Sequence, residues 1–248
     1  MILKLLTYNI RHGGVGRERA LASVINGEAP DLVMLQEARR PDVVQRLARA
    51  TGMATAIAAP GRSVACISRV PVARYKWVRP LFSQHAFLEV VLDAADVRIF
   101  GVHLSAVHAA WTERRRVREL RSLLNATTKH AEGFHFLVGD FNTLAPNEAL
   151  DVTRLPYRLR VLVWLSGGRI RWQTIAIMLG ANYVDAFRTF DPANAGFTFP
   201  TWDPHIRLDY AFLPKRFAER LASCAVVREN PDTRQASDHF PLRIDVNC

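Results

Sequence analysis

Cysteine is scarce in this chain of 248 residues, which contains only Cys66, Cys224 and Cys248. The number is odd and no two cysteines have CxxC spacing, so neither a disulfide framework nor a cysteine-based zinc site is expected. So few cysteines are typical of a protein in a reducing compartment, and we expect a cytoplasmic location.

Long apolar runs are also missing. No stretch approaches the ~20 uninterrupted apolar residues that a transmembrane helix needs. The start, MILKLLTYNI, is too short an apolar run for a signal peptide and lacks a small-residue cleavage site. There is no internal repeat, low-complexity linker or evident boundary, so we expect one domain over residues 1–248.

Acidic residues are outnumbered. Lys and Arg total 33 against 23 for Asp and Glu, which gives a formal net charge of +10. This balance favours a polyanionic partner, either nucleic acid or an anionic membrane surface. The alternative is a basic surface with no such partner.

Short apolar runs predict a strand-rich α/β protein, with two packed, mostly antiparallel sheets flanked by helices. Helical spacing predicts helices over 17–26, 41–50 and 112–125. Strands are predicted over 2–9, 31–37, 64–68, 72–78, 86–92, 97–104, 134–138, 183–187, 208–213, 222–228 and 242–246.

Six short polar motifs lie where these apolar runs stop. Any one of them alone could be a turn or a helix cap, but six in series are hard to explain as packing. They supply the carboxylate, amide and imidazole groups that hold a hard divalent cation and cleave a phosphate ester beside it. The motifs are Thr7-Tyr8-Asn9, Leu35-Gln36-Glu37, Val102-His103-Leu104, Gly139-Asp140-Phe141-Asn142, Arg207-Leu208-Asp209-Tyr210 and Ser237-Asp238-His239-Phe240-Pro241.

The carboxylates of these motifs divide into two candidate roles. Mg²⁺ prefers oxygen ligands, so Glu37 and Asp238 are candidate metal ligands. Asp140 and Asn142 lie two positions apart after a predicted strand, and in extended geometry both would point to one side of the sheet. There the carboxylate could act on the water and the amide on the phosphate.

The histidines suit contacts to phosphate oxygens. His103 and His239 could each provide one, and Asp209 could orient His239 as a carboxylate orients an imidazole in other catalytic pairs. Each has a simpler interpretation, since a lone histidine is more often a satisfied, half-buried side chain.

Arginine is concentrated in two segments. The predicted helix 112–125 carries arginines beside its apolar stripe, and residues 153–179 read as a pair of short amphipathic helices. These segments could grip backbone phosphates or lie on a membrane interface; alternatively the aromatic and apolar residues pack on the core and the arginines are solvated. The candidate substrate-binding residues are Arg114, Arg158, Arg160, Arg169, Arg171, Trp164 and Trp172.

Taken in order, the motifs TYN, LQE, HL, GDFN, RLDY and SDHFP resemble the endonuclease/exonuclease/phosphatase superfamily. This superfamily includes exonuclease III-like apurinic (AP) endonucleases, deoxyribonuclease I, neutral sphingomyelinases and inositol polyphosphate 5-phosphatases. The match runs from Asn9 to Pro241, and GDFN followed by SDHFP is its most specific part. The resemblance implies a four-layered α/β sandwich and a Mg²⁺- or Mn²⁺-dependent hydrolase.

Carried over motif by motif, the resemblance implies that Glu37 and Asp238 bind the cation, with Asn9 close by. It further implies that Asp140 activates or orients the water, that Asn142 and His103 contact the phosphate, and that Asp209 pairs with His239. Exonuclease III-like enzymes usually carry Tyr where this chain has His103, and Trp just before their Arg-Ile-Asp-Tyr motif. The histidine is closer to the deoxyribonuclease I and sphingomyelinase branches, so the motifs leave the substrate open.

Three functions are compatible with the sequence. The first is a Mg²⁺-dependent DNA nuclease with 3′–5′ exonuclease or AP endonuclease activity, favoured by the basic charge. The second is a lipid head-group phosphodiesterase, sphingomyelinase-like, or a phosphatase of the same superfamily. The third, a basic binding module with a decayed site, is disfavoured because every motif residue is intact. We expect a monomer.

Overall fold

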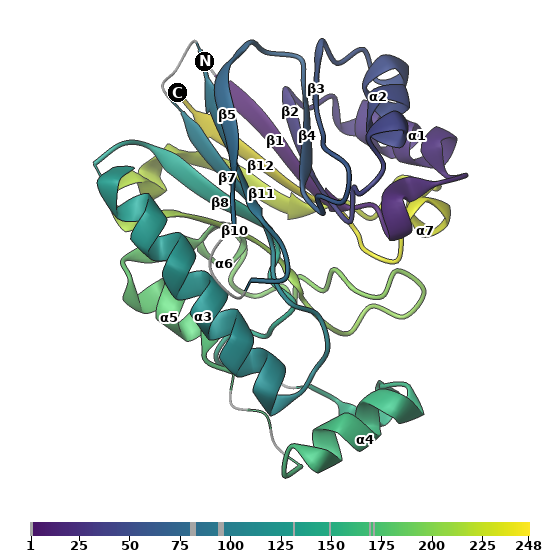
Figure 1. The fold of residues 1–248 in the computed structure, drawn as a ribbon, viewed down its shortest axis with the longest axis vertical. Coiled ribbons are helices and arrows are strands. Elements are labelled where there is room, and N and C mark those ends of the chain that lie inside the picture. The colour runs from purple at the N-terminus through teal and green to yellow at the C-terminus, as the bar shows by residue number, and fades with distance from the viewer. Residues whose placement is uncertain are drawn as a thin grey trace.

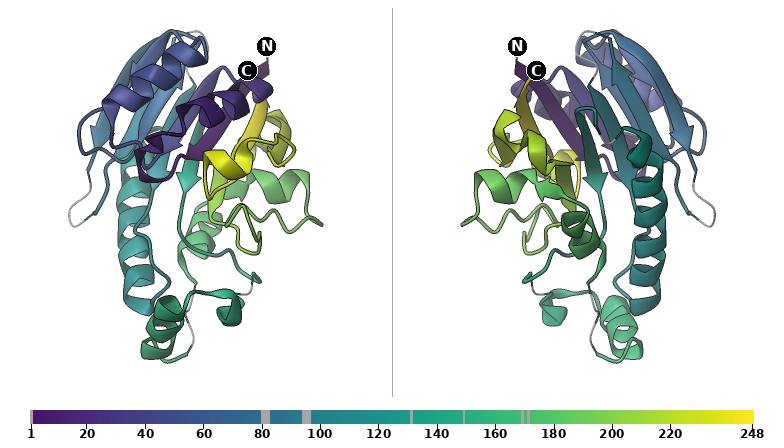
Figure 2. Two further views of the ribbon diagram at one scale, coloured as in Figure 1. Left: turned by 90° about the vertical axis from the view of Figure 1, so that its right-hand side faces the viewer. Right: turned by 90° about the vertical axis from the view of Figure 1, so that its left-hand side faces the viewer.

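The computed structural model describes residues 2–79, 83–93, 97–130, 132–148, 150–168, 170 and 172–248. Within them, two six-stranded sheets pack face to face, with helices on both outer faces (Figures 1 and 2). The predicted four-layered α/β sandwich is thus confirmed. Both termini lie side by side at one end of it.

The first sheet is built around the N-terminal strand. Its order is β11 (Leu221–Val226), β12 (Leu242–Asn247), β1 (Ile2–Asn9), β2 (Leu32–Gln36), β4 (Ala65–Ser68) and β3 (Thr55–Ile57). Only the β1–β2 pair is parallel. The short edge strand β3 was not predicted.

The second sheet has the order β5 (Val72–Val78), β6 (Phe87–Leu92), β7 (Arg98–His103), β8 (His135–Asp140), β10 (Asp209–Pro214) and β9 (Tyr183–Asp185). Here only β7 and β8 run parallel. Each sheet therefore has one parallel pair near its middle, and the carboxyl ends of both pairs carry the predicted motifs.

Successive side chains of a strand point to opposite faces of its sheet, so one strand contributes to two apolar layers. Leu3 and Leu5 of β1 face the apolar layer between the sheets, whereas Leu6 and Tyr8 face outward to the helices. The helices α1 (Glu18–Glu28) and α2 (Pro41–Ala50) cover that outer face. On the other side, α3 (Ala110–Thr127) and α5 (Thr174–Gly180) cover the second sheet.

Short elements complete the fold. They are α4 (Tyr157–Leu165), α6 (Ala186–Phe190), α7 (Thr233–Ala236) and the 3-10 helices η1 (His12–Gly14), η2 (Thr128–His130), η3 (Val152–Arg154) and η4 (Lys215–Arg220). In Figure 1, α4 lies at the lower end of the molecule, away from both sheets. No helix among the described residues is long and apolar enough to cross a membrane.

The predicted strand over 183–187 is only half correct. Strand β9 ends at Asp185, whose side chain accepts hydrogen bonds from the backbone N–H groups of Phe187 and Arg188. This capping starts α6 at once, so the chain turns helical where the apolar pattern alone suggested a continuing strand.

Candidate active site

The strand ends bring all six motifs to one edge of the sandwich. Strands β1, β2, β7 and β8 end there, and the antiparallel strands β10 and β12 begin there. Asp140 is paired in register with His103 on one side and with Asp209 on the other. The parallel pairs thus place residues from distant parts of the chain side by side.

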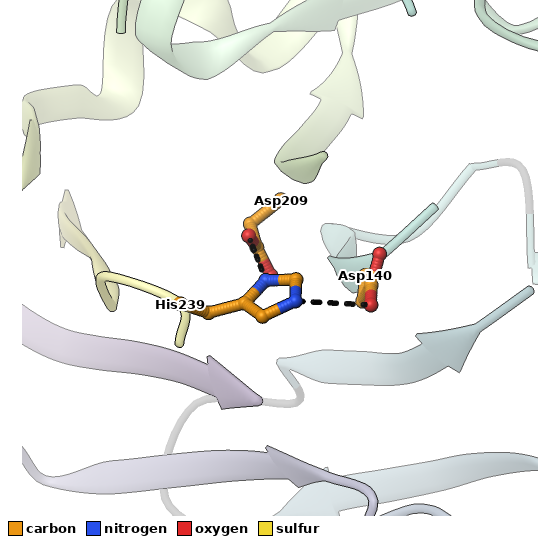
Figure 3. Close-up of side chains that lie close together, drawn as sticks. All are labelled: Asp140, Asp209 and His239. Carbon is orange, nitrogen blue, oxygen red and sulfur yellow. Dashed lines mark hydrogen bonds and ion pairs between the residues drawn. The ribbon is translucent and has the colours of Figure 1, made fainter. Parts of the chain in front are cut away.

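Asp140, Asp209 and His239 form the centre of the site, here called the catalytic cluster (Figure 3). His239 Nδ1 lies 2.8 Å from Asp209 Oδ2, and its Nε2 lies 4.0 Å from Asp140 Oδ2. The ring of Phe199 packs 4.8 Å from the imidazole. The short distance is a hydrogen bond, whereas 4.0 Å leaves His239 and Asp140 apart.

The charges of the cluster are set by burial and by one another. Burial raises the pKa of the Asp140 carboxyl to about 7, and the nearby His239 opposes this rise. Burial disfavours the charged imidazole of His239, but Asp209, Asp140 and Asp238 outweigh it and raise the pKa of His239 to about 10. His239 is therefore protonated at neutral pH, and Asp140 can exchange a proton there.

Glycine is needed directly before Asp140. Gly139 has φ 145°, and a Cβ atom at this position would meet the carbonyl oxygen of Val102 at 1.9 Å. Only glycine lets β8 approach β7 this closely. The Gly-Asp sequence thus sets the position of Asp140 against the neighbouring strand.

Asn142 reaches the site by a turn, which corrects the expected extended geometry. Its φ is 51°, a left-handed conformation that Asn tolerates, and its N–H donates to Asp140 Oδ1 at 2.9 Å. Its side-chain amide donates to the carbonyl of Leu104 at 3.2 Å. The backbone of Asn142 is therefore tied to Asp140, and its side-chain amide is tied to Leu104, just after β7.

His103 is held by two residues that the motifs do not include. Its Nδ1 is hydrogen-bonded to the Ser63 hydroxyl, and the His85 ring stacks on it at 4.5 Å. Its Nε2 lies 3.9 Å from Asp140 Oδ2. Burial, with the neighbouring histidines, holds the pKa of His103 well below its ordinary value, so the ring is neutral. Ser63 and His85 lie outside any motif, and only the fold shows their proximity.

The outer side of the site carries Glu37 and Asp238. Asn9 donates from Nδ2 to Asp140 Oδ2 at 3.0 Å and lies 3.5 Å from Glu37 Oε1, while its amide oxygen accepts from Arg11 N–H. The Arg11 guanidinium lies 3.4 Å from Asp238 Oδ2. Asn9 therefore turns its amide nitrogen, not its oxygen, toward the carboxylates.

These groups fit a divalent cation. The ligand atoms of the catalytic cluster all lie within 4.8 Å of one another, close enough for a metal ion. The predicted ligands Glu37 and Asp238 are not members of this group, and His239 could join it only after losing its Nε2 proton. Asp209 Oδ1 is buried with no hydrogen-bond partner in the described part of the chain. The side chains of Glu37 and Asp238 are 29% and 19% exposed, so a cation bound there could keep water ligands, as Mg²⁺ does.

The predicted substrate-binding residues are not gathered at the strand ends. Arg114 is exposed on α3, and Arg158, Arg160 and Trp164 are exposed on α4. Trp172 is half-buried, with its ring 5.9 Å from His108 and 6.0 Å from the Arg116 guanidinium. Trp172 therefore contributes to packing beside α3. Arg169 and Arg171 lie outside the described residues.

Comparison with known proteins agrees with this geometry. The sequence profile of the Endonuclease/Exonuclease/phosphatase family matches residues 6–239. No curated protein sequence matches the chain. Fold and site together define a hydrolase that acts on phosphate ester bonds. Because the matched region spans almost the whole sequence, the chain belongs to the endonuclease/exonuclease/phosphatase family.

Several solved structures have the same fold. An AP endonuclease from Archaeoglobus fulgidus is 17% identical with a TM-score of 0.76, covering 99% of this chain and 100% of the other. The 3′ phosphatase NExo from Neisseria, bound to a product DNA hairpin, has 17% identity, a TM-score of 0.73 and the same coverages. A family member from Beutenbergia cavernae has 23% identity and a TM-score of 0.72, covering 99% of this chain and 71% of the other. At these identities the likeness shows the fold alone.

Proposed function

We propose that this protein is a Mg²⁺- or Mn²⁺-dependent nuclease that hydrolyses phosphodiester bonds of DNA, as a 3′–5′ exonuclease, an AP endonuclease or both. The observation that carries the proposal is the buried Asp140 carboxylate placed between Asn9, His103 and His239. The net charge of +10 supports a polyanionic substrate. So do the structural relatives described as an AP endonuclease and as a phosphatase bound to DNA.

Glu37 and Asp238 would hold the cation. When bound, the cation supplies polarisation of a nonbridging phosphate oxygen and neutralises part of its charge. Asn9 keeps Glu37 and Asp140 in place by donating its amide N–H groups to both. Arg11, beside Asp238, adds a second positive charge at the outer side of the site.

Asp140 is the proposed base. Its Oδ1 accepts from Asn142 N–H, while its Oδ2 faces the space between the Nε2 atoms of His103 and His239. Burial raises the pKa of this carboxyl above its ordinary value, which suits a group that takes a proton from water. His239 already carries its proton, which leaves Asp140 as the acceptor.

Three hydrogen-bond donors would stabilise the negative charge of the phosphate. Protonated His239 can donate from Nε2, because Asp209 holds its Nδ1 side. Neutral His103 can donate from Nε2 when the Ser63 hydroxyl donates to its Nδ1. The second amide hydrogen of Asn142 is the third donor. Groups fixed by their own neighbours stabilise developing charge without reorganising.

A lipid head-group phosphodiesterase is the second candidate, favoured by one observation. On α4, Tyr157, Trp164 and Leu165 are 72%, 73% and 59% exposed beside Arg158 and Arg160. Exposed aromatic and basic side chains on one short helix are also typical of membrane-interface binding.

A panel of substrates tests the choice. Turnover is measured with and without Mg²⁺ on single-stranded, duplex and abasic DNA, on 3′-phosphorylated DNA and on sphingomyelin vesicles. The proposal expects Mg²⁺-dependent cleavage of DNA phosphodiesters. Turnover of sphingomyelin alone would favour the second candidate, and release of 3′ phosphate alone would make the protein a phosphatase.

A further inference from the structure

Trp202 is a large aromatic side chain that the fold leaves exposed beside the catalytic cluster. It lies between α6 and β10 and is 62% exposed, whereas Thr198, Thr201 and Ile206 in the same segment are buried. Exposed tryptophans that occur singly are ordinary on protein surfaces. What distinguishes Trp202 is how firmly its segment is held and to what.

The segment around Trp202 is a closed turn. Thr198 N–H donates to the carbonyl of Ile206 at 2.9 Å, and Ile206 N–H donates back to Phe199 at 3.0 Å. At the tip, Asp203 N–H donates to Pro200 at 3.1 Å. The Asp203 carboxylate is also paired with Arg154. The backbone that carries the indole is therefore bonded on both sides.

This turn is fastened to the residues of the proposed reaction. Thr201 donates from its N–H to the carbonyl of Asp238 and from its hydroxyl to the carbonyl of Ser237, both at 2.9 Å. On the other side, the Thr198 hydroxyl accepts from the backbone N–H of Asp209 at 3.3 Å. The backbone on either side of Trp202 is thus bonded to Asp209 and to the two residues that precede His239.

A row of rings leads from the surface to the cluster. The Trp202 ring lies 6.3 Å from that of Phe199, which lies 4.8 Å from the imidazole of His239. Phe199 thus lies between the exposed indole and the imidazole, so a base stacked on the indole would belong to a nucleotide near a phosphate bound at His239.

We propose that Trp202 is a stacking platform for an unpaired nucleobase adjacent to the scissile phosphate, so that the enzyme favours single-stranded or frayed DNA. The inference rests on the proposed DNA nuclease function and adds a specificity-determining residue to it. Every base offers a π-face, so one indole accepts any of the four without reading sequence. A lipid surface fits less well, because the next residue, Asp203, is a half-exposed carboxylate.

The test compares two single-stranded oligonucleotides of equal length, one carrying thymine bases and one made of abasic spacers. Both have the same phosphates, so only the bases differ. The variants are Trp202→Ala, Trp202→Phe as the conservative rescue, and Trp111→Ala as a matched control, since Trp111 is a half-exposed tryptophan at the start of α3.

We expect Trp202→Ala to lower kcat/KM on the thymine oligonucleotide by about 10-fold, mainly through KM, and on the abasic one by less than about 2-fold. Trp202→Phe should recover most of the loss, and Trp111→Ala should behave as wild type. Binding of the thymine oligonucleotide should also quench tryptophan fluorescence less in Trp202→Ala than in Trp111→Ala.

Failure of the Trp202 proposal can be distinguished from failure of the proposed nuclease function. If wild type cleaves thymine DNA and Trp202→Ala loses equally on both oligonucleotides, or on neither, the platform is wrong while the nuclease function stands. If wild type in Mg²⁺ cleaves neither oligonucleotide but does cleave duplex or abasic duplex DNA, the platform is wrong while the nuclease function stands. If wild type cleaves no DNA of any kind, the proposed function is wrong and the platform is wrong with it.

Discussion

The strand-end site and the α4 region (residues 150–168) differ in how much of their geometry is fixed. At the strand ends, the side chains of Asp140, Asp209 and His239 are buried and bonded to neighbours. On α4, Val163 is the one fully buried residue and the arginines point into solvent. The side chains that would perform the chemistry are held in one position by their neighbours. The exposed arginine side chains of α4 can take several conformations.

The difference follows from what holds each region. The site is anchored by strand pairs that the large core on both faces keeps in register. The α4 region rests on a small apolar cluster that includes Leu144, Leu155 and Val163. A few buried side chains give little stabilisation beyond the entropy cost of ordering the segment. Mutations should therefore separate turnover at the strand ends from binding at α4.

The largest expected effect is that of metal removal. Exhaustive chelation should abolish hydrolysis, because Glu37 and Asp238 would hold the cation that the reaction needs. Salt-dependent DNA binding through the arginines should remain measurable. Turnover and filter binding are assayed before and after chelation, and after Mg²⁺ is restored. Full hydrolysis without metal would contradict the proposed mechanism.

Asp140→Asn should lower turnover by at least ~10²-fold, the usual scale for loss of a general base, while the fold survives. Asp151→Asn is the matched control in the α4 region, since Asp151 is exposed and caps η3. Thermal unfolding and kcat are measured for both. Near-normal turnover in a folded Asp140→Asn protein would move the base to the Asp209–His239 pair.

The boundary between the regions should be sensitive to acid through His108, which lies against Trp172. Burial, reinforced by Arg116, lowers the pKa of His108 to about 4 from the ordinary 6.5. Between these pH values the unfolded chain binds a proton that the folded one does not. Stability should therefore fall as the pH drops from 6.5 to 4, with about 3 kcal/mol of the loss due to this group.

The His108 contribution is isolated by comparing wild type with His108→Gln in denaturant titrations at several pH values. The other buried histidines remain in both proteins, so the difference in slope reports His108. The variant should lose about 3 kcal/mol less than wild type between pH 6.5 and 4. Parallel curves would show that His108 takes up a proton without cost.

The smallest expected effect is at the α4 arginines. The double variant Arg158→Gln/Arg160→Gln should weaken duplex binding for all sequences and flatten the slope of log K against log salt by up to ~0.9 per lost phosphate contact. The control Arg19→Gln/Arg49→Gln removes equal charge from exposed positions on α1 and α2. Equal slopes in the two variants would leave α4 without a specific role in DNA binding. Loss of binding to anionic vesicles alone would assign it to a membrane.

Most of the fold could be predicted from apolar periodicity. Helix α2 and strands β1 and β5 have the expected bounds, because an uninterrupted apolar pattern or a proline marks their ends. Strand β3 could not be predicted, since three residues at a sheet edge carry no pattern of their own. The turn into α6 depends on a single capping carboxylate, a local signal that the apolar run over 183–187 masks.

The candidate site also contains residues that the sequence predicts and residues that only the structure shows. The convergence of Asn9, Asp140 and His239 could be expected because their motifs lie at strand ends. Ser63 and His85 could not, because their contacts with His103 come from packing between separate segments. Nor does sequence distinguish Trp172, which packs on Arg116, from Trp164, which faces solvent. Side-chain partners across the fold are set by tertiary structure, not by spacing.

The bond between the Ser237 hydroxyl and the Asn9 carbonyl joins residues 228 positions apart, next to the pairing of β1 with β12. During synthesis, Asn9 and Glu37 are therefore made long before Asp238 and His239. Such long-range pairing forms late and slowly. If the proposed mechanism is right, a chain that ends before Ser237 lacks the imidazole of His239 and should not hydrolyse its substrate.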